Sequence, residues 1–76
     1  MSSDIEQITS KLLKRGYIIR KFPEKIEISK SDVKLVLYPN IGGCLIIRYK
    51  GNRVLGKAYG SLSNINDVFK LLGEPP

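Results

Sequence analysis

Apolar and polar side chains alternate through residues 25–59, KIEISKSDVKLVLYPNIGGCLIIRYKGNRVLGKAY, and this stretch decides the fold. An apolar residue at every second position is typical of a β-strand with one buried face. The alternation predicts strands at residues 25–29, 33–38, 44–50 and 53–59. Residues 17–22 are rich in β-branched and aromatic side chains and are a weaker candidate. We therefore expect an antiparallel meander of three to four strands.

Three turns connect these strands and set their register. Lys30 and Ser31 can form a two-residue hairpin loop, and Gly51 with Asn52 can form a tight turn. Residues 39–43 can form a five-residue loop that contains two glycines. A slip of one residue in any pairing would turn an apolar set to the wrong side of the sheet. With these turns, one face collects Ile26, Ile28, Val33, Leu35, Leu37, Leu45, Ile47, Tyr49, Val54 and Ala58.

A helix is predicted before the strands and another after them. The first spans residues 4–15: its apolar residues have helical spacing, Ser3 and Glu6 can form a capping box, and Gly16 can end it. The second follows Gly60: Ser61 or Ser63 can cap it, and Gly73 can end it. Its apolar stripe consists of Ile65, Val68, Phe69 and Leu72. We expect a single two-layer α+β domain over residues 1–76, in the order α-β-β-β-β-α, with both helices packed on one face of the sheet.

The composition excludes several classes of protein. The chain has 76 residues with 13 Lys plus Arg, 7 Asp plus Glu, no His and one Cys, so its formal charge is +6. One Cys cannot form an internal disulfide, and without His a Cys/His zinc site is excluded. No apolar run approaches the roughly 20 residues of a membrane-spanning helix, and the acidic N-terminal stretch is not a signal peptide. We expect a soluble, cytoplasmic protein without metal or cofactor, of a composition compatible with a thermophile.

The register gives the other face of the sheet an excess of positive charge. Residues 33–66 contain no acid, and Lys34 would lie opposite Arg48, as Lys50 would lie opposite Arg53. Like charges across a sheet repel, and a polyanion would relieve this repulsion and release counterions. Basic residues also simply solubilise proteins and protect sheet edges. We predict a non-enzymatic, largely sequence-independent nucleic-acid-binding face, DNA or RNA, made of Lys34, Arg48, Lys50, Arg53 and Lys57, with Tyr38 and Tyr59 for stacking on bases.

Two other surfaces offer alternative contacts. Val36, Ile46 and Leu55 would form an exposed apolar island on the same face. A protein partner or a second copy of the chain could dock there, as in an adaptor or an accessory subunit of a nucleic-acid-processing complex. Single exposed apolar residues are also common without any role. A second basic group consists of Lys11, Lys14, Arg15, Arg20 and Lys21.

Two features resemble catalytic or ligand sites, and both are interpreted as structural. Residues 51–58 match G-x-x-x-x-G-K, the start of a phosphate-binding loop. Ala58, however, stands where a hydroxyl would bind magnesium, and no helical pattern follows Lys57. Cys44 would lie on the exposed face opposite Tyr38, with no histidine to act as its base. We therefore expect no enzymatic activity.

The order of elements resembles that of double-stranded-RNA-binding domains, whose basic helix-start motif is absent from residues 64–70. The Lys-Arg-Gly-Tyr stretch at residues 14–17 resembles that of small antitoxin-paired ribonucleases, which need a histidine that this chain lacks. Neither resemblance carries a functional residue over to this sequence.

Overall fold

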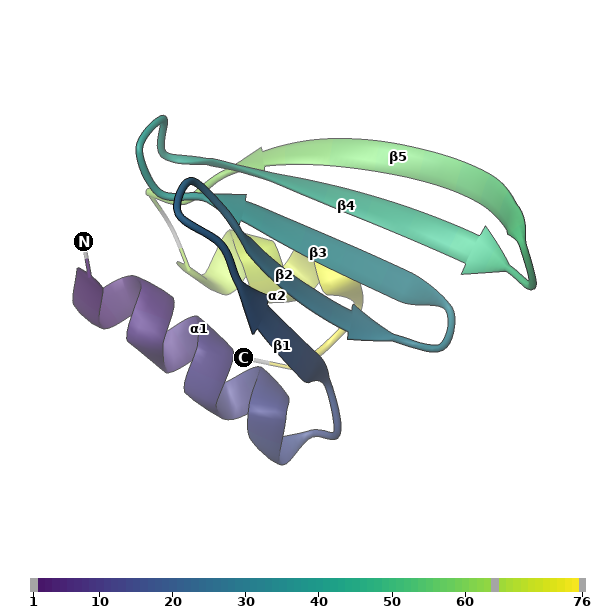
Figure 1. The fold of residues 1–76 in the computed structure, drawn as a ribbon, viewed down its shortest axis with the longest axis horizontal. Helices are drawn as coiled ribbons and strands as arrows, with labels where there is room; N and C mark the ends of the chain where they lie inside the picture. The colour runs from purple at the N-terminus through teal and green to yellow at the C-terminus, as the bar shows by residue number, and fades with distance from the viewer. Residues whose placement is uncertain (1, 64, 76) are drawn as a thin grey trace.

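The predicted meander is present, with five strands instead of three to four (Figure 1). The computed structural model describes residues 2–63 and 65–75, and for residues 2–4 and 65 it describes the backbone alone. The predicted capping box of Ser3 therefore lies outside the described side chains. The elements are α1 (Ser2–Lys14), β1 (Ile18–Lys21), β2 (Ile26–Lys30), β3 (Val33–Tyr38), β4 (Gly43–Lys50), β5 (Arg53–Ser61) and α2 (Ile65–Leu72).

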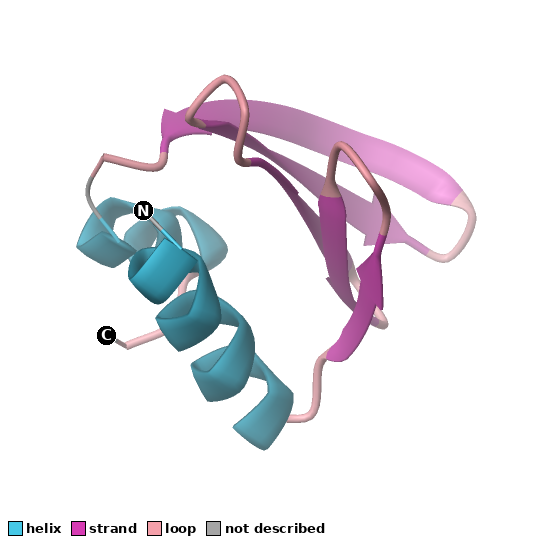
Figure 2. Ribbon diagram, turned by 60° about the vertical axis from the view of Figure 1, so that its left-hand side comes forward, coloured by secondary structure: helices cyan, strands magenta, loops and turns pink. Residues whose placement is uncertain are grey.

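Each strand pairs antiparallel with the strand that follows it in the chain, so the order in the sheet is β1-β2-β3-β4-β5. The weaker candidate at residues 17–22 supplies β1, which adds the fifth strand. Both helices lie on one side of the sheet (Figure 2), with α1 next to β1 and α2 next to β4 and β5. The predicted α+β class, with two helices on one face of an antiparallel meander, is confirmed.

The core lies between the sheet and the helices. Leu12 of α1 and Phe69 of α2 are at most 1% exposed, as is Leu35 of β3 between them. Burying one such side chain contributes about 1.5–3 kcal/mol relative to leaving it in water. The remaining buried members of this cluster are Ile8, Tyr17, Ile28, Val33, Leu37, Cys44, Ile46, Leu62, Val68 and Leu72.

Both helices end in the same backbone hydrogen-bond pattern. A backbone amide just beyond each helix donates to the carbonyl five positions earlier, at 3.1 Å for Tyr17 and 2.9 Å for Glu74. In each case the preceding residue, Gly16 or Gly73, has a positive φ, which completes a Schellman motif. The predicted helix ends at these glycines are confirmed. The Tyr17 hydroxyl also donates to Glu74 Oε2 at 2.9 Å, so the two helix ends are tied together.

The first hairpin keeps the predicted faces, and the third keeps its predicted turn. The first turns at Ser31 and Asp32, because Lys30 pairs with Val33. This register is two residues away from the predicted one, and a shift of two leaves every side chain on its expected side. The third hairpin turns at Gly51 and Asn52, as predicted, with Lys50 opposite Arg53.

The second hairpin differs from the prediction by one residue. Tyr38 pairs with Gly43, so the loop has four residues instead of five. The Tyr38 carbonyl accepts hydrogen bonds from the amides of Ile41 at 3.2 Å and Gly42 at 2.9 Å, and Gly42 has a φ of 69°. Glycine adopts this left-handed conformation without a steric cost, so the chain reverses one residue earlier than predicted.

This single-residue difference exchanges the two faces of β4. Cys44 and Ile46 were predicted on the uncovered face and are instead 3% and 1% exposed, in the core. Leu45, Ile47 and Tyr49 were predicted in the core and instead lie on the uncovered face. The predicted core is therefore wrong for these residues, because the side-chain period of a strand is two.

A β-bulge then changes the faces of β5. Arg48 pairs with Gly56 but Tyr49 pairs with Val54, so Leu55 is the extra residue. Val54 lies on the uncovered face, contrary to prediction, because it stays paired with Tyr49 of the exchanged strand β4. The bulge then returns Ala58 to the helix side, as predicted. We call the surface opposite the helices the open face. Its residues are Ile18, Arg20, Lys25, Glu27, Ser29, Lys34, Val36, Tyr38, Leu45, Ile47, Tyr49, Val54, Lys57, Tyr59 and Ser61.

Small residues on β5 allow α2 to pack closely. Gly56, Ala58 and Gly60 occupy successive helix-side positions of this strand. A Cβ added to Gly60 would lie 2.7 Å from Leu71 Cδ1 and 3.2 Å from Cys44 Sγ, which is too close for an unadjusted side chain. The observed register thus places the β5 residues with the smallest side chains under α2. Cys44 and Ile46 of β4 fill the space that remains between the sheet and this helix.

Candidate nucleic-acid interface

The β4–β5 hairpin projects beyond the rest of the sheet. β3 begins at Val33, which pairs with Arg48, so the hairpin continues past the end of β3. The amide of Tyr49 donates to the carbonyl of Asp32 at 2.8 Å, and this is the last backbone link that the structure shows between the hairpin and its neighbour. Figure 1 shows the tip of the β4–β5 hairpin extending past the β2–β3 hairpin. A projecting two-stranded ribbon can reach a groove or a single strand without a clash from the body of the domain.

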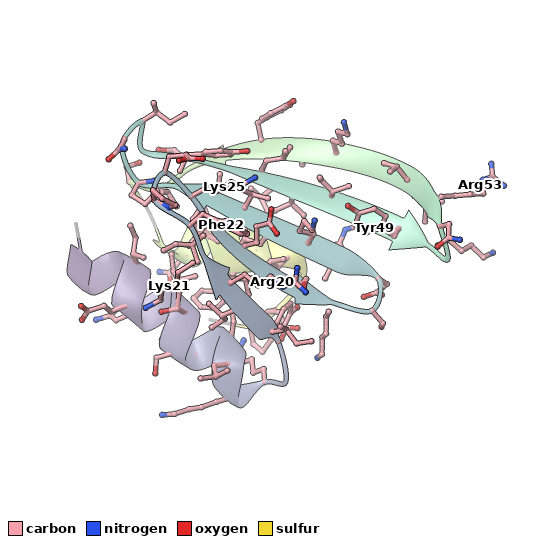
Figure 3. The ribbon with its side chains drawn as sticks, in the orientation of Figure 1. Arg20, Lys21, Phe22, Lys25, Tyr49 and Arg53 are labelled. Carbon is pink, nitrogen blue, oxygen red and sulfur yellow. The ribbon has the colours of Figure 1, made fainter. Side chains whose placement is uncertain are left out.

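The hairpin carries four basic residues and no acidic one. Lys50 and Arg53 face each other across the tip, and both are exposed. Arg53 points away from the sheet at the end of the molecule (Figure 3). Lys57 lies further along β5 on the open face and is also exposed. The predicted opposition of Lys50 and Arg53 is confirmed, and like charges at this position repel each other.

Arg48, the fourth basic residue of the hairpin, has a different environment from the one predicted. It lies on the helix side, where its Nη2 donates to the carbonyl of Leu71 at 2.9 Å. A cation that binds a last-turn carbonyl satisfies an unpaired acceptor and the negative end of the helix dipole. The placement of Arg48 on the open face was therefore wrong, and its guanidinium supports α2.

Lys34 also differs from the prediction, although it lies on the open face as expected. It pairs with Ile47 instead of Arg48. Its Nζ lies 3.9 Å from Glu27 Oε1, and Lys25 Nζ lies 3.3 Å from Glu27 Oε2. Glu27 thus partly neutralises this region, so the uncompensated positive charge of the sheet is concentrated toward β5 and the hairpin tip.

Three tyrosines lie on adjacent strands of the open face. Tyr38 and Tyr59 occupy the predicted face, and Tyr59 is 78% exposed. Tyr49, which the sequence placed in the core, is the third (Figure 3). Its position could have been found from the glycine at position 42, which permits the shorter loop. Exposed rings close to basic side chains provide stacking surfaces for unpaired bases.

The predicted apolar island does not form. Ile46 is in the core, Val36 lies on the open face but is only 4% exposed, and Leu55 is 63% exposed at the bulge. Since these three do not share an accessible surface, the proposed docking patch is wrong in its composition. The open face instead carries Leu45, Ile47 and Val54 on β4 and β5.

The second basic group is divided among several contacts. Lys11 Nζ and Arg15 Cζ lie 5.7 Å and 5.4 Å from the centre of the Phe69 ring. Arg15 Nη1 also lies 3.4 Å from Glu74 Oε1 and donates to the carbonyl of Pro75. Arg20 and Lys21 lie on β1, at the opposite edge of the sheet from the hairpin. These residues do not form one surface.

The features that resemble reactive sites have structural environments. The segment 51–58 forms the turn and first part of β5, and a strand continues past Lys57. Cys44 was predicted on the exposed face and is instead buried, and burial raises the pKa of its thiol. A thiol with a raised pKa is a weak nucleophile. Among the described residues, no group of three or more His, Cys, Asp or Glu side chains is placed to hold a metal ion.

No family model, curated protein or solved structure matches this chain. Neither helix in the described part of the chain has the length and apolar content needed to cross a membrane.

Proposed function

We propose that this protein is a non-enzymatic, cytoplasmic nucleic-acid-binding module that uses the β4–β5 hairpin and the adjoining open face. The observation that supports it best is the projecting, acid-free hairpin whose Lys50 and Arg53 face each other at the tip. Phosphates placed between these side chains replace a repulsion with two attractions, and bound counterions are released.

The same surface favours binding that depends little on base sequence. Lys50, Arg53 and Lys57 are flexible cations suited to phosphate contacts, which position a protein on nucleic acid without reading its sequence. Tyr49 and Tyr59 add rings that can stack on any unpaired base, at about 1–3 kcal/mol per base. We therefore expect single strands to bind more tightly than duplexes of the same length.

The test is fluorescence anisotropy with an oligothymidine and a duplex of equal length, titrated at several salt concentrations. The wild-type protein should bind, with an affinity that falls linearly with salt on logarithmic axes. In the double variant K50Q/R53Q the slope with the single strand should fall by about 1.4, or about 0.7 for each lost phosphate contact. Tyr59→Leu should weaken binding to the single strand more than binding to the duplex.

A matched control removes the same charge elsewhere. Lys14 and Arg20 are exposed and far from the hairpin, and the structure shows no hydrogen bond or ion pair of either described side chain. The double variant K14Q/R20Q should keep the wild-type slope. An equal loss in both double variants would show that net charge alone governs binding, and absence of binding at low salt would contradict the proposal.

A second candidate function is an adaptor that docks a protein through the open face. Leu45, Ile47 and Val54 favour it, because they form an apolar strip on a sheet surface that no helix covers. Ile47→Glu should then abolish a partner complex or a homodimer, detected by light scattering and cross-linking, while binding to oligothymidine persists. A strictly monomeric protein whose Ile47→Glu variant keeps its cross-linking pattern would exclude this function.

A further inference from the structure

The strand β1 forms an outer edge of the sheet. Within the described residues 2–63 and 65–75, β2 is its only strand neighbour. The amide of Phe22 donates to Lys25 at 2.8 Å, which fixes the alternation of hydrogen-bonding pairs along these antiparallel strands. Residues 18 and 20 therefore exchange bonds with β2, and the amides and carbonyls of Ile19 and Lys21 point outward. These groups form a short template for a further strand.

An open groove of about 460 Å³ runs beside this edge, between α1 and β1. It is lined mainly by carbon atoms, from Glu6, Thr9, Ser10, Leu13, Ile19 and Lys21. Leu13 is 60% exposed here, whereas Ile8 and Leu12 of the same helix are buried. A strand added to β1 would direct alternate side chains into this groove and would cover Leu13.

The other side of the same edge is also apolar. Ile18 of β1 is 64% exposed, and Phe22, directly after this strand, is 42% exposed, so apolar side chains stand two residues before and after Arg20. Figure 3 shows Arg20 and Phe22. An added strand would thus find apolar neighbours on both faces of the sheet. Apolar side chains on both sides of a free edge are unusual for a monomer, since such edges promote association.

The charge at this edge indicates the chemistry of the partner. Arg20 and Lys21 lie on β1, Lys14 lies in the last turn of α1, and residues 7–23 contain no acid. The acids near this edge are Glu6, which lines the groove, Glu24 in the β1–β2 turn, and Glu27, which pairs with Arg20. Glu27 already lies within 4 Å of the ammonium groups of Lys25 and Lys34, so positive charge remains in excess here. A second copy of β1 would bring these cations against their own equivalents, whereas an acidic segment would neutralise them.

We propose that β1 and its groove bind an extended peptide of alternating apolar and acidic residues, which adds a sixth strand to the sheet. Its backbone pairs with Ile19 and Lys21, its apolar side chains enter the groove beside Leu13, and its carboxylates lie next to Arg20. This is recognition by strand addition, in which main-chain bonds give affinity and alternate side chains give specificity. The site is independent of the hairpin, because β1 and β5 are opposite edges of the sheet.

The test uses a synthetic ten-residue peptide of alternating Val and Glu, followed by amide NMR of the intact chain. The amides of Ile19 and Lys21 should shift and exchange more slowly with solvent, while those of Lys50 and Arg53 stay unchanged. A peptide of alternating Val and Lys should bind about tenfold more weakly, as expected for two screened ion pairs. The variant R20Q/K21Q should lose this preference and keep the wild-type spectrum elsewhere.

Three results would overturn the proposal. The first is no shift at β1 with the acidic peptide. The second is equal binding of both peptides to the wild-type protein. The third is a change in the NMR signals of the same amides when only the protein concentration is raised. That change would show that β1 pairs with a second copy of the chain. None of these results bears on the oligothymidine experiment, so the two proposals can fail separately.

Discussion

Glu74 is the residue that joins the two helix ends. It accepts a hydrogen bond from the Tyr17 hydroxyl at 2.9 Å, and its other oxygen lies 3.4 Å from Arg15 Nη1. Tyr17 is 3% exposed, so its phenol has lost most of its contact with water. Burial first, and then the bond to Glu74 and the charges of Glu74 and Asp32, raise the pKa of Tyr17 to about 12.

This shift predicts a loss of stability at alkaline pH. Below pH 10 the phenol is neutral in both states, so the contribution of Tyr17 to folding is complete. Between pH 10 and pH 12 the unfolded chain releases this proton while the folded protein holds it, so the free energy of unfolding falls, by about 2–3 kcal/mol in total. Urea unfolding at a series of alkaline pH values measures this fall in the free energy of unfolding.

Tyr17→Phe isolates the contribution of this one group, because the two proteins differ only in the phenolic hydroxyl. The variant should be less stable at neutral pH by about 0.5–1.5 kcal/mol, for the lost hydrogen bond. The difference between the two proteins should shrink and then change sign as the pH rises through the window, because the wild-type loss exceeds the value of the hydrogen bond. A constant difference from pH 9 to pH 12 would show that the phenol is not held neutral by the fold.

At the scale of elements, the register of the second hairpin determines which residues of β4 stabilise the domain. Ile46→Ala should lower the free energy of unfolding by about 2–5 kcal/mol, because it leaves a cavity in the core. Ile47→Ala, the same change one residue later, should cost less than half of that, since Ile47 is only half-buried on the open face. Urea denaturation of the matched pair measures both. A larger effect at Ile47 would support the five-residue loop.

The elements themselves were predictable from the sequence because several local signals agree. Both helices have apolar stripes and glycines at their ends, and Gly51 with Asn52 marks the third turn. The faces of β4 were not predictable in this way. Residues 44–47 are apolar at four consecutive positions, so alternation gives no information about which pair is buried. The length of the β3–β4 loop and the small β5 residues under α2 together determine which residues of β4 are buried.

Part of the candidate site was also predictable from local sequence signals, and part was not. The basic tip at Lys50 and Arg53 follows from the third turn alone, and that turn was correctly identified. The use of Arg48 as a partner for α2 depends on where a distant helix ends, which no local pattern contains. Tyr49 was assigned to the core because its face depended on the loop between β3 and β4.

At the scale of the whole molecule, positive charge is unevenly distributed. The formal charge is +6, and residues 33–66 hold five basic residues and no acid. Self-repulsion of this kind destabilises a compact state and is screened by salt. We predict that the free energy of unfolding rises by about 1 kcal/mol between low salt and about 0.5 M sodium chloride. Urea midpoints in the two buffers measure it.

The variant K50Q/R53Q provides the comparison for this prediction. Removing the opposed pair at the tip should stabilise the protein at low salt, by about 0.2–1 kcal/mol, and should reduce the gain from added salt. A wild-type protein whose stability is the same in both buffers would show that the charges are compensated within the fold. In that case relief of charge repulsion would contribute nothing to the free energy of nucleic-acid binding.

The meander also has a consequence for biosynthesis. Every strand pairs with its immediate successor, so each hairpin can close as soon as its second strand has left the ribosome. The cover for β4 and β5 is made last, because Val68, Phe69 and Leu72 belong to α2. A nascent chain therefore leaves the inner surface of β4 and β5 bare, with Cys44 and Ile46 accessible to chaperones, until α2 has also left the ribosome.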